Sequence, residues 1–355
     1  MFENENNRTE LGELGEFGLI KHIGQFVELN NDESVKGIGD DAAVIDFGKQ
    51  QCVVSSDMLI EGVHFDLTFT PLKHLGYKAV VVNLSDIYSM NAEPRQITVN
   101  IAMSNRFSLE AVEEIYTGIA LACKKYNVDL IGGDTSSSTS GLILSVTAIG
   151  RAKKEDLVYR SGAEEENLIC VTGDLGSAYM GLQLLEREKQ VYLQNPDMQP
   201  EFDGNDYILE RQLKPEAKKE LIEQLKELNI KPTSMIDISD GLASELFHIC
   251  DASEVGCQIY EDKLPIDHQT VHICGEWSMN PITAALNGGE DYELLFTIPL
   301  SDYEKIKDRG DISIIGHITP KSAGLQFIPR GGEAIELQAQ GWDAFKSRHD
   351  PELEN

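Results

Sequence analysis

The sequence predicts a two-domain protein of the α+β or α/β class, and three observations support this prediction. The 355 residues are enough for two domains, each able to bury its own core. Hydrophobic residues make up 41% and charged residues 25% of the chain, which is typical of a soluble globular protein. Strand-like and helix-like segments are mixed along both halves. We expect one domain at 1–150, a second at 151–345 and a polar tail at 346–355.

The first domain is expected to combine four or five strands with two long helices. A polar start precedes a segment of helical spacing at 14–29. Strand patterns then cover 42–47, 51–56, 96–103, 128–131 and 141–150, and helical patterns cover 73–88 and 108–126. Ser108 is a typical N-cap residue, Pro94 is expected to break the chain, and Asp57 follows the end of its strand. The apolar strand at 128–131 is short, and we expect it to be buried.

The second domain is expected to begin after a charged segment at 151–167. Strand patterns cover 168–172, 293–298 and 312–318, and helical patterns cover 177–188 and 215–228. The segment 234–239 leads into a further helix at 242–250. A glycine-containing turn at 173–176 separates the first strand from the first helix. Residues 190–206 are polar and contain proline, so we interpret them as a surface insertion.

The charge of the chain limits its partners. Sixty acidic and thirty basic residues give a formal net charge of -30. Such a protein repels nucleic acid and anionic membranes, so neither is expected as a partner. Nucleotides remain possible, because Mg²⁺ mediates between carboxylates and phosphates.

The cysteines and the apolar segments indicate a cytoplasmic protein. The six cysteines show neither a C-x-x-C pair nor zinc-type spacing, and we expect free, mostly buried thiols. The acidic start lacks the apolar core of a signal peptide, so none is expected. No apolar run reaches the ~18 residues of a membrane span.

Two adjacent carboxylates in a glycine-containing loop are the most unusual local feature. Asp40 and Asp41 follow Gly37 and Gly39, and such neighbouring charges repel unless water or a cation neutralises them. Other acidic residues lie in similar settings, at the junction of an apolar run and a turn: Asp57, Asp86, Asp134, Asp237, Asp240, Glu290 and Asp291. We expect these residues to converge on metal ions that carry a phosphorylated ligand.

Single aspartates also have purely structural interpretations. Asp240 before Gly241 fits a helix N-cap, and Asp134 after two glycines fits an Asx turn. Asp40 and Asp41 are harder to explain in this way, because a cap needs only one carboxylate. Of the two, Asp41 is expected to be the direct metal ligand, with Asp40 supporting it or shaping the turn.

The usual nucleotide and zinc motifs are missing. The sequence contains no G-x-x-x-x-G-K-[ST], no G-x-G-x-x-G after a strand and no H-E-x-x-H. The eight histidines are scattered and form no ligand pair. A metal site in this chain must therefore be built from oxygen, which favours Mg²⁺, Mn²⁺ or Ca²⁺.

Seven ordered motifs resemble those of the thiamine-monophosphate kinase family. They are GIGDDAAV (37–44), SSDML (55–59) with His64, NLSDIYSMNAEP (83–94), LIGGDTS (130–136), RSGA (160–163), IDISDGLASEL (236–246) and LNGGEDYELLFT (286–297). This family belongs to the superfamily of aminoimidazole ribonucleotide synthetase and selenophosphate synthetase. The resemblance extends over residues 17–342. The insertion near 190–210 lies outside it and is expected to stay away from the site.

The resemblance implies ATP-dependent phosphorylation of thiamine monophosphate to thiamine diphosphate with several Mg²⁺ ions. The implied metal ligands are Asp41, Ser55, Ser56, Asp57, Asp86, Asp134, Asp237 and Asp240. The implied ATP contacts are Tyr116, Gly133, Asp134, Arg160 and Ser239. The implied thiamine-binding residues are His64, Glu290 and Trp342.

The implied fold has two α/β domains in a homodimer. The N-terminal sheets of two subunits pair into a shared barrel, and ATP lies near that interface. The acceptor is a phosphate monoester with a second pKa of ~6, so it is largely a dianion at neutral pH. No catalytic residue acting as general base is then needed, and we expect direct in-line transfer without a phosphoenzyme. Arg160 is expected to contact phosphate, and Trp342 to lie against the thiazolium or the pyrimidine.

Two other functions compete with this interpretation. One is another enzyme of the superfamily, an amidine- or selenophosphate-forming synthetase. The selenophosphate branch usually carries a reactive cysteine in an N-terminal glycine-rich loop, whereas residues 1–39 contain no cysteine here. The other is a non-catalytic acidic protein that binds divalent cations. Such a protein would not need Arg160, or the paired glycines before Asp134 and Glu290.

Overall fold

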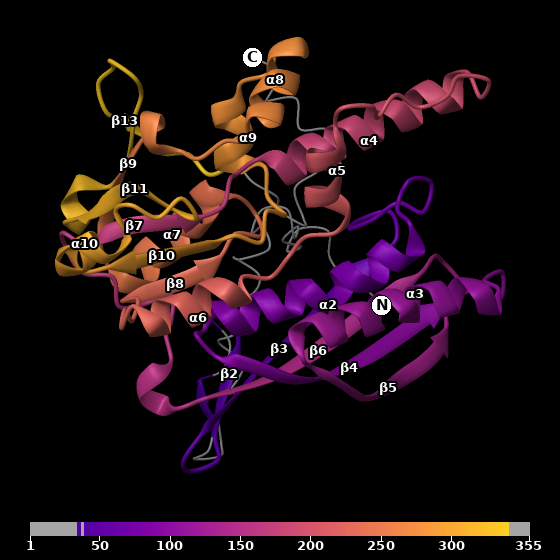
Figure 1. The fold of residues 1–355 in the computed structure, drawn as a ribbon, viewed down its shortest axis with the longest axis horizontal. Helices are drawn as coiled ribbons and strands as arrows, with labels where there is room; N and C mark the ends of the chain where they lie inside the picture. The colour runs from indigo at the N-terminus through magenta and orange to yellow at the C-terminus, as the bar shows by residue number, and fades with distance from the viewer. Residues whose placement is uncertain (1–33, 37–38, 341–355) are drawn as a thin grey trace, which may run out of the picture.

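The computed structural model describes residues 34–36 and 39–340, which form two separate sheets covered by helices (Figure 1). The two sheets share no strand, and both combine with helices, so the predicted mixed α/β class is confirmed. The helix expected at 14–29, the residue Trp342 and the polar tail lie outside the described residues. The proposed domain limits remain a prediction.

The first sheet has six strands in the order β1-β2-β3-β6-β4-β5. Its strands are β1 (Ser34–Lys36), β2 (Ala43–Asp46), β3 (Gln51–Ile60), β4 (Glu93–Met103), β5 (Asp129–Ser137) and β6 (Ile143–Ala152). Two helices, α2 (Leu72–Ser89) and α3 (Leu109–Tyr126), lie together on one side of this sheet (Figure 1). The hydroxyl of Ser108 accepts from the amide of Ala111, which confirms the predicted N-cap.

One face of this sheet is less covered than the other. Buried and partly exposed residues alternate along β6, because successive strand side chains point to opposite faces. The edge strand β5 is exposed along its whole length, with Leu130 at 41% and Ile131 at 59%. The expectation of a short buried strand at 128–131 was therefore wrong. The strand is nine residues long, and Gly132, Gly133 and Asp134 lie inside it instead of in an Asx turn.

Two other strand boundaries differ from the sequence expectation. Strand β3 continues past Asp57 to Ile60, so Asp57 lies within the strand and not at its end. Pro94 does not break the chain but lies in the second position of β4. The pairing of β4 with β6 shifts register between Pro94 and Gln96, and such an irregularity tolerates a residue without an N–H.

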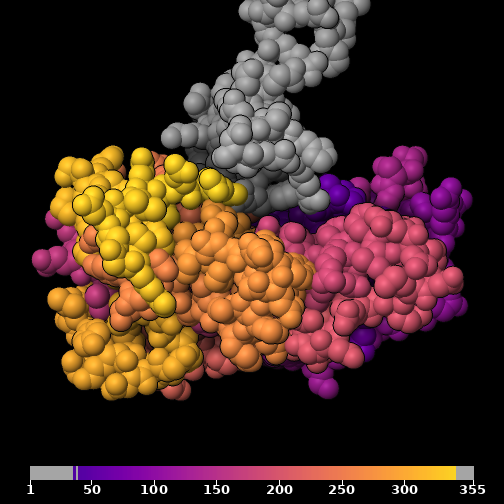
Figure 2. Space-filling model, turned by 90° about the horizontal axis from the view of Figure 1, so that it is seen from above, coloured from indigo at the N-terminus to yellow at the C-terminus, as the bar shows by residue number. Residues whose placement is uncertain are grey.

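The second sheet has seven strands in the order β13-β12-β9-β11-β7-β10-β8. Its strands are β7 (Leu168–Thr172), β8 (Ser234–Asp237), β9 (Gly256–Tyr260), β10 (Leu294–Ile298), β11 (Ile312–Thr319), β12 (Leu325–Ile328) and β13 (Ile335–Glu336). The helices are α4 (Ser177–Gln194), α5 (Asp206–Leu213), α6 (Lys219–Glu227), α7 (Leu242–Ser253), α8 (His268–Glu276), α9 (Pro281–Asn287) and α10 (Tyr303–Ile306). Figure 2 shows α8 and α9 (orange) on the surface beside α4 (pink).

Both faces of the second sheet are buried. Leu294 and Phe296 of β10 point into a core shared with the first half of the chain. Leu295, on the opposite face, packs with Leu246 of α7. The continuous apolar run of β10 is what a strand covered on both sides requires.

Several elements of the second half differ from the prediction. Helix α4 is longer than expected and ends at Gln194, and α6 begins only at Lys219. The N-cap position of α7 is held by Gly241 with φ 113°, not by Asp240. The amide of Asp240 instead donates to the Glu245 carboxylate (3.1 Å). The elements β9, β12, β13, α5, α8 and α9 were not predicted.

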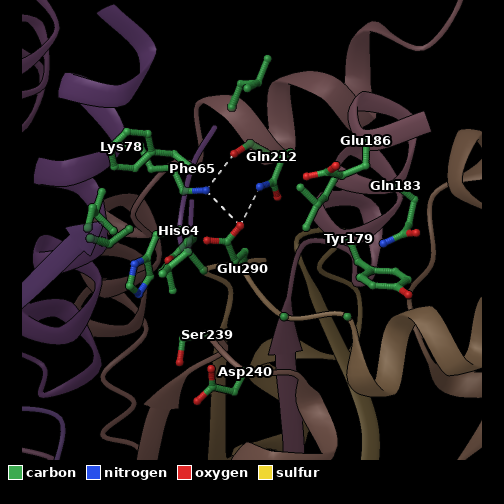
Figure 3. Close-up of a pocket in the computed structure, with 18 of the residues that line it drawn as sticks. His64, Phe65, Lys78, Tyr179, Gln183, Glu186, Gln212, Ser239, Asp240 and Glu290 are labelled. Atoms are coloured by element: carbon green, nitrogen blue, oxygen red, sulfur yellow. Dashed lines mark hydrogen bonds and ion pairs between the residues drawn. The ribbon is translucent and has the colours of Figure 1, made fainter. Parts of the chain in front are cut away.

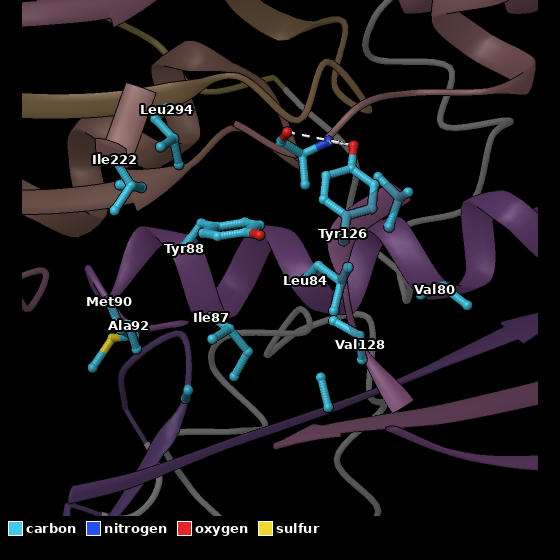
Figure 4. Packing of buried hydrophobic residues seen from close by; sticks show 14 of the residues in the cluster. Val80, Leu84, Ile87, Tyr88, Met90, Ala92, Tyr126, Val128, Ile222 and Leu294 are labelled. Carbon is cyan, nitrogen blue, oxygen red and sulfur yellow. Dashed lines mark hydrogen bonds between the residues drawn. The ribbon is translucent and has the colours of Figure 1, made fainter. Parts of the chain in front are cut away.

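The two halves are joined by a common apolar core (Figure 4). Tyr88 of α2 lies near Ile222 of α6 and Leu294 of β10. At the edge of this core the Tyr126 hydroxyl accepts from the amide of Ala217 (2.9 Å). The position of α2 relative to the second sheet is therefore fixed by packing.

None of the helices in the described part of the chain combines the length and apolarity that a membrane crossing requires.

Candidate active site

A cavity of about 1150 Å³ lies where the two halves of the chain meet (Figure 3). The first half contributes β3, the segment 62–70 and one face of α2. The second half contributes α4, the end of α5, the turn after β8 and the segment before β10. No residue of the 190–210 insertion is among those that line the cavity.

Three aspartates from distant parts of the sequence meet beside this cavity. Asp41 precedes β2, Asp86 lies in the last turn of α2, and Asp237 ends β8. One carboxylate oxygen of each lies within 4.8 Å of the others. Asp57 joins them, because its side chain interacts with that of Asp86. The structure therefore brings these four aspartates together, as the sequence predicted.

Polar contacts hold strand β3, which carries Asp57, against helix α2, which carries Asp86. Ser55 and Asp57 lie on the same face of β3, which is the face toward α2. The Ser55 hydroxyl donates to the carboxylate of Asp86, and the Asp57 amide donates to Asn83 (2.9 Å). Ser56, which points to the other face, instead contacts Thr147 (2.9 Å). The Ser56 hydroxyl is therefore directed away from the aspartate cluster.

Mutual repulsion and burial make the cluster electrostatically unfavourable when all carboxylates are ionised. Burial, followed by the neighbouring charges of Asp57 and Asp237, raises the pKa of Asp86 well above its ordinary value. Burial, then the charge of Asp41, raises the pKa of Asp237 to about 7. Burial likewise raises the pKa of Asp57 to about 6. A cation at this position would relieve the repulsion.

Asp40 and Asp41 have different roles in their loop. Asp40 accepts from the Arg160 amide (3.2 Å) and from the amide of Asp41 (3.3 Å), so it shapes the turn and ties it to the second half. Asp41 accepts from the Arg160 guanidinium (2.6 Å), and its side chain is only 1% exposed. This agrees with the expectation that Asp40 supports the loop. The Arg160 guanidinium, which was expected to contact phosphate, is paired with the Asp41 carboxylate in this structure.

The residues of the cluster fit a divalent cation. Oxygen Oδ2 of Asp41 is buried and has no hydrogen-bond partner among the described residues. The ligand atoms that Asp41, Asp86 and Asp237 offer are all carboxylate oxygens, the type that Mg²⁺ and Ca²⁺ prefer. Oxygen-only metal binding, predicted from the scarcity of histidine pairs, suits this geometry.

Three other predicted residues lie away from the aspartate cluster, two on strand β5 and one on helix α3. Gly133 of β5 is paired with β4, and strands β6 and β4 separate β5 from β3. Asp134 follows it, exposed. Tyr116 of α3 is partly buried against the core and does not line the cavity. Their metal and ATP contacts remain predictions.

The turn after β8 and the segment before β10 are tied together by backbone hydrogen bonds. The amide of Glu290 donates to the Ser239 carbonyl (2.6 Å), and that of Tyr292 donates to the Ile238 carbonyl (2.9 Å). Both donors have positive φ, 57° at Glu290 and 49° at Tyr292, so this segment is held in an unfavourable backbone conformation. Ser239, Asp240 and Glu290 consequently line the same cavity.

The Glu290 carboxylate is held by two residues that sequence reasoning missed (Figure 3). Lys78 donates to its Oε2 (3.0 Å), and the amide nitrogen of Gln212 donates to the same oxygen (2.7 Å). A lysine within the apolar run of α2 was a usable signal for the first of them, because only a paired lysine is stable when buried. Gln212 lies outside every motif and gave no such signal.

His64 lines the cavity from the first half of the chain, whereas Glu290 lines it from the second half (Figure 3). The amide of Ile60 donates to its Nδ1 (3.0 Å), so a neutral imidazole carries its hydrogen on Nε2. Asp291, by contrast, points away from the cavity lining and accepts from the Gly176 amide (2.9 Å). The structure thus brings His64 and Glu290 to one cavity and excludes Asp291 from it.

The family model described as AIR synthase related protein, N-terminal domain, matches residues 39–152. Residues 39–152, which include the first sheet from β2 to β6, are thus similar to the N-terminal domain of the AIR synthase related class. Thiamine-monophosphate kinase of Bacillus subtilis (strain 168) is 33% identical over 94% of this chain and 100% of its own. That of Aquifex aeolicus (strain VF5) is also 33% identical, over 94% of this chain and 99% of its own.

A solved structure described as AaThiL complexed with AMPPCP and TMP is 30% identical. The structural alignment covers 96% of this chain and 100% of the AaThiL chain, with a TM-score of 0.80. This chain belongs to the thiamine-monophosphate kinase family.

Proposed function

We propose that this protein transfers the γ-phosphate of ATP to thiamine monophosphate, giving thiamine diphosphate, as a cytoplasmic homodimer. The observation that carries the proposal is the meeting of Asp41, Asp86 and Asp237 beside the cavity that also contains His64 and Glu290. The names of the full-length relatives and the ligands named for the AaThiL structure support the same activity.

Several Mg²⁺ ions are expected to be held by the aspartate cluster. Asp41, Asp86 and Asp237 would contribute carboxylate oxygens directly, with Asp57 beside them. When bound, Mg²⁺ neutralises charge on both the γ-phosphate and the attacking phosphate. We expect Asp240, from the turn after β8, to complete the acidic wall.

The remaining residues bind and orient the acceptor. At neutral pH the acceptor phosphate is already largely a dianion, so no side chain has to remove a proton. We expect the Nε2–H of His64 to donate to the substrate and the Glu290 carboxylate to accept from it. Because nucleophile and γ-phosphate are oriented within one cavity, transfer is in line and direct.

A second copy of the chain is expected to cover the open face of the first sheet. Leu130 and Ile131 expose apolar side chains on β5, next to Gly133 and Asp134, the residues expected to bind ATP. An exposed edge strand that carries large apolar side chains is normally paired or covered. Light scattering should give the mass of a dimer, and Ile131→Lys should shift that mass toward one chain.

The activity is tested with purified protein, ATP, Mg²⁺ and thiamine monophosphate, measuring thiamine diphosphate directly. We expect product formation that requires both ATP and Mg²⁺. The alternative is an amidine- or selenophosphate-forming synthetase of the same superfamily. Absence of thiamine diphosphate, together with cleavage of ATP that depends on an added amide or selenide substrate, would establish that alternative instead.

A further inference from the structure

Both the backbone and the side-chain carboxylate of Glu290 are held by hydrogen bonds. Its backbone amide donates to Ser239, and its backbone adopts a positive φ of 57°. Its side-chain oxygen Oε2 accepts from Lys78 and from Gln212. A side chain with this many constraints presents one orientation to the cavity.

Lys78 is the unusual member of this arrangement. Its side chain is 5% exposed and lies on α2 in the first half of the chain, whereas its partners belong to the second half. Besides Glu290 it donates to the backbone carbonyl of Gln212 (3.1 Å). A buried ammonium is stable only with such acceptors. Lys78 therefore holds the Glu290 segment in place and does not act at the protein surface.

The contacts divide the two oxygens of Glu290 into different roles. Because the ammonium of Lys78 and the amide of Gln212 both donate, Oε2 can only accept in this arrangement. Oxygen Oε1 has no donor among the described residues, and the carboxylate lines the cavity. The site therefore offers a ligand one fixed acceptor oxygen.

We propose that Lys78 is a positioning residue that makes this site selective for a substrate with an N–H donor at the Glu290 end. The inference rests on the proposed function and deepens it. In thiamine monophosphate the matching group is the exocyclic amine of the aminopyrimidine. An analogue with a 4′-oxo group presents an acceptor to Oε1 instead. Two facing acceptors repel, so the oxo compound is rejected.

The selectivity depends on Lys78 because of what the carboxylate can do without it. With Lys78 removed, Oε2 keeps only Gln212, and the carboxylate gains freedom to rotate. Oε1 then no longer points in one fixed direction, so an amine gains less from it and an oxo group is repelled less. Preference for the amine falls, while binding of ATP, for which other residues are expected, is unaffected.

The experiment compares thiamine monophosphate with its 4′-oxo analogue as phosphate acceptors. Four proteins are measured: the unaltered chain, Lys78→Met, Lys78→Arg and Lys218→Met. Arginine can hold a carboxylate with two donors, so Lys78→Arg is the conservative variant. Lys218→Met is the matched control, because it removes another lysine paired with a buried carboxylate, Glu293 (2.6 Å), away from the cavity lining.

We expect the unaltered chain to favour the amine by about 100-fold or more in kcat/KM. Lys78→Met should lower that preference about tenfold and raise KM for thiamine monophosphate, with KM for ATP unchanged. Lys78→Arg should keep most of the preference, and Lys218→Met all of it. Thermal unfolding checks that each variant folds. If Lys78→Met does not fold, Gln212→Leu removes the other donor to Oε2 and is judged by the same ratio.

Three results would overturn the inference. An undiminished preference in Lys78→Met overturns it alone, and so does a parallel rise of KM for ATP, which would indicate a general structural role. Absence of thiamine diphosphate from the unaltered chain overturns the proposed function and this inference together.

Discussion

The two ends of the cavity handle carboxylates in opposite ways. At one end, burial and neighbouring carboxylates raise the pKa values of Asp86 and Asp237, and Arg160 is the cation paired with the nearby Asp41. At the other end, the single carboxylate of Glu290 is paired with a buried lysine. The first arrangement is incomplete without an added cation, whereas the second is complete within the chain. This contrast separates the metal-binding role from the substrate-binding role on physical grounds.

The comparison predicts opposite stability effects for neutralising a carboxylate at each end. Removing charge from the aspartate cluster relieves repulsion, so the metal-free protein becomes more stable. Removing charge from Glu290 leaves Lys78 buried beside a neutral group, so the protein becomes less stable. Asp41 is unsuited to this test, because its removal would also leave Arg160 unpaired.

The largest expected effect is that of Asp86→Asn. We expect at least a 1000-fold loss of kcat, about 4 kcal/mol, because the charge that holds the cation is gone. In metal-free buffer the midpoint of thermal unfolding should rise by about 1–2 °C, the shift that ~1 kcal/mol produces in a protein of this size. Lowered stability of this variant would mean that Asp86 is structural. Retained activity would mean that the cluster does not bind the reacting metal.

Glu290→Gln should have the next largest effect. KM for thiamine monophosphate is expected to rise by about 10–100-fold, since a charged acceptor is replaced by a neutral amide. The same change should lower the unfolding midpoint by a few degrees. Adding Lys78→Met to Glu290→Gln should restore part of that loss, because the unpaired ammonium is removed with its partner. An additive, lower midpoint in the double variant would contradict the pairing.

The pH dependence of stability should distinguish metal-free from Mg²⁺-bound protein. The pKa of Asp57 is raised from 3.8 to about 6 and that of Asp237 to about 7. The folded state therefore binds more protons than the unfolded state between about pH 4 and 7, and this contribution to stability is lost as pH rises through that window. Mg²⁺ should reverse the loss, because it binds the ionised cluster. Unfolding midpoints with a chelator and with Mg²⁺ would measure this difference, and parallel curves would argue against the site.

The sequence was most informative where one residue type carries the function by itself. Asp41, Asp86 and Asp237 could be predicted because each lies inside one of the motifs that resemble the thiamine-monophosphate kinase family. Their convergence follows from the fold, and the mixed class was readable from alternating patterns. Length and periodicity decide such features locally.

The sequence was least informative where function depends on a pair of distant residues. Gln212 gave no signal in the sequence, and the unusual position of Lys78 in an apolar run did not identify Glu290 as its partner. Similarly, the apolar residues of β5 suggested burial, yet Leu130 and Ile131 are exposed. Local apolarity does not show whether another element covers a strand, and for this reason the burial prediction failed there.

The smallest expected effect concerns the contact that connects the two sides of the cavity. Lys189 of α4 forms an ion pair with Asp66 and lies 5.8 Å from the ring centre of Phe69, both in the segment that carries His64. The pair is partly exposed, so its contribution is about 0.2–1 kcal/mol. Lys189→Ala should therefore raise KM for thiamine monophosphate no more than about fivefold, leave KM for ATP unchanged, and have less effect at high salt. A larger effect, or one that falls on ATP, would show that α4 contributes to the site through more than its hold on this segment.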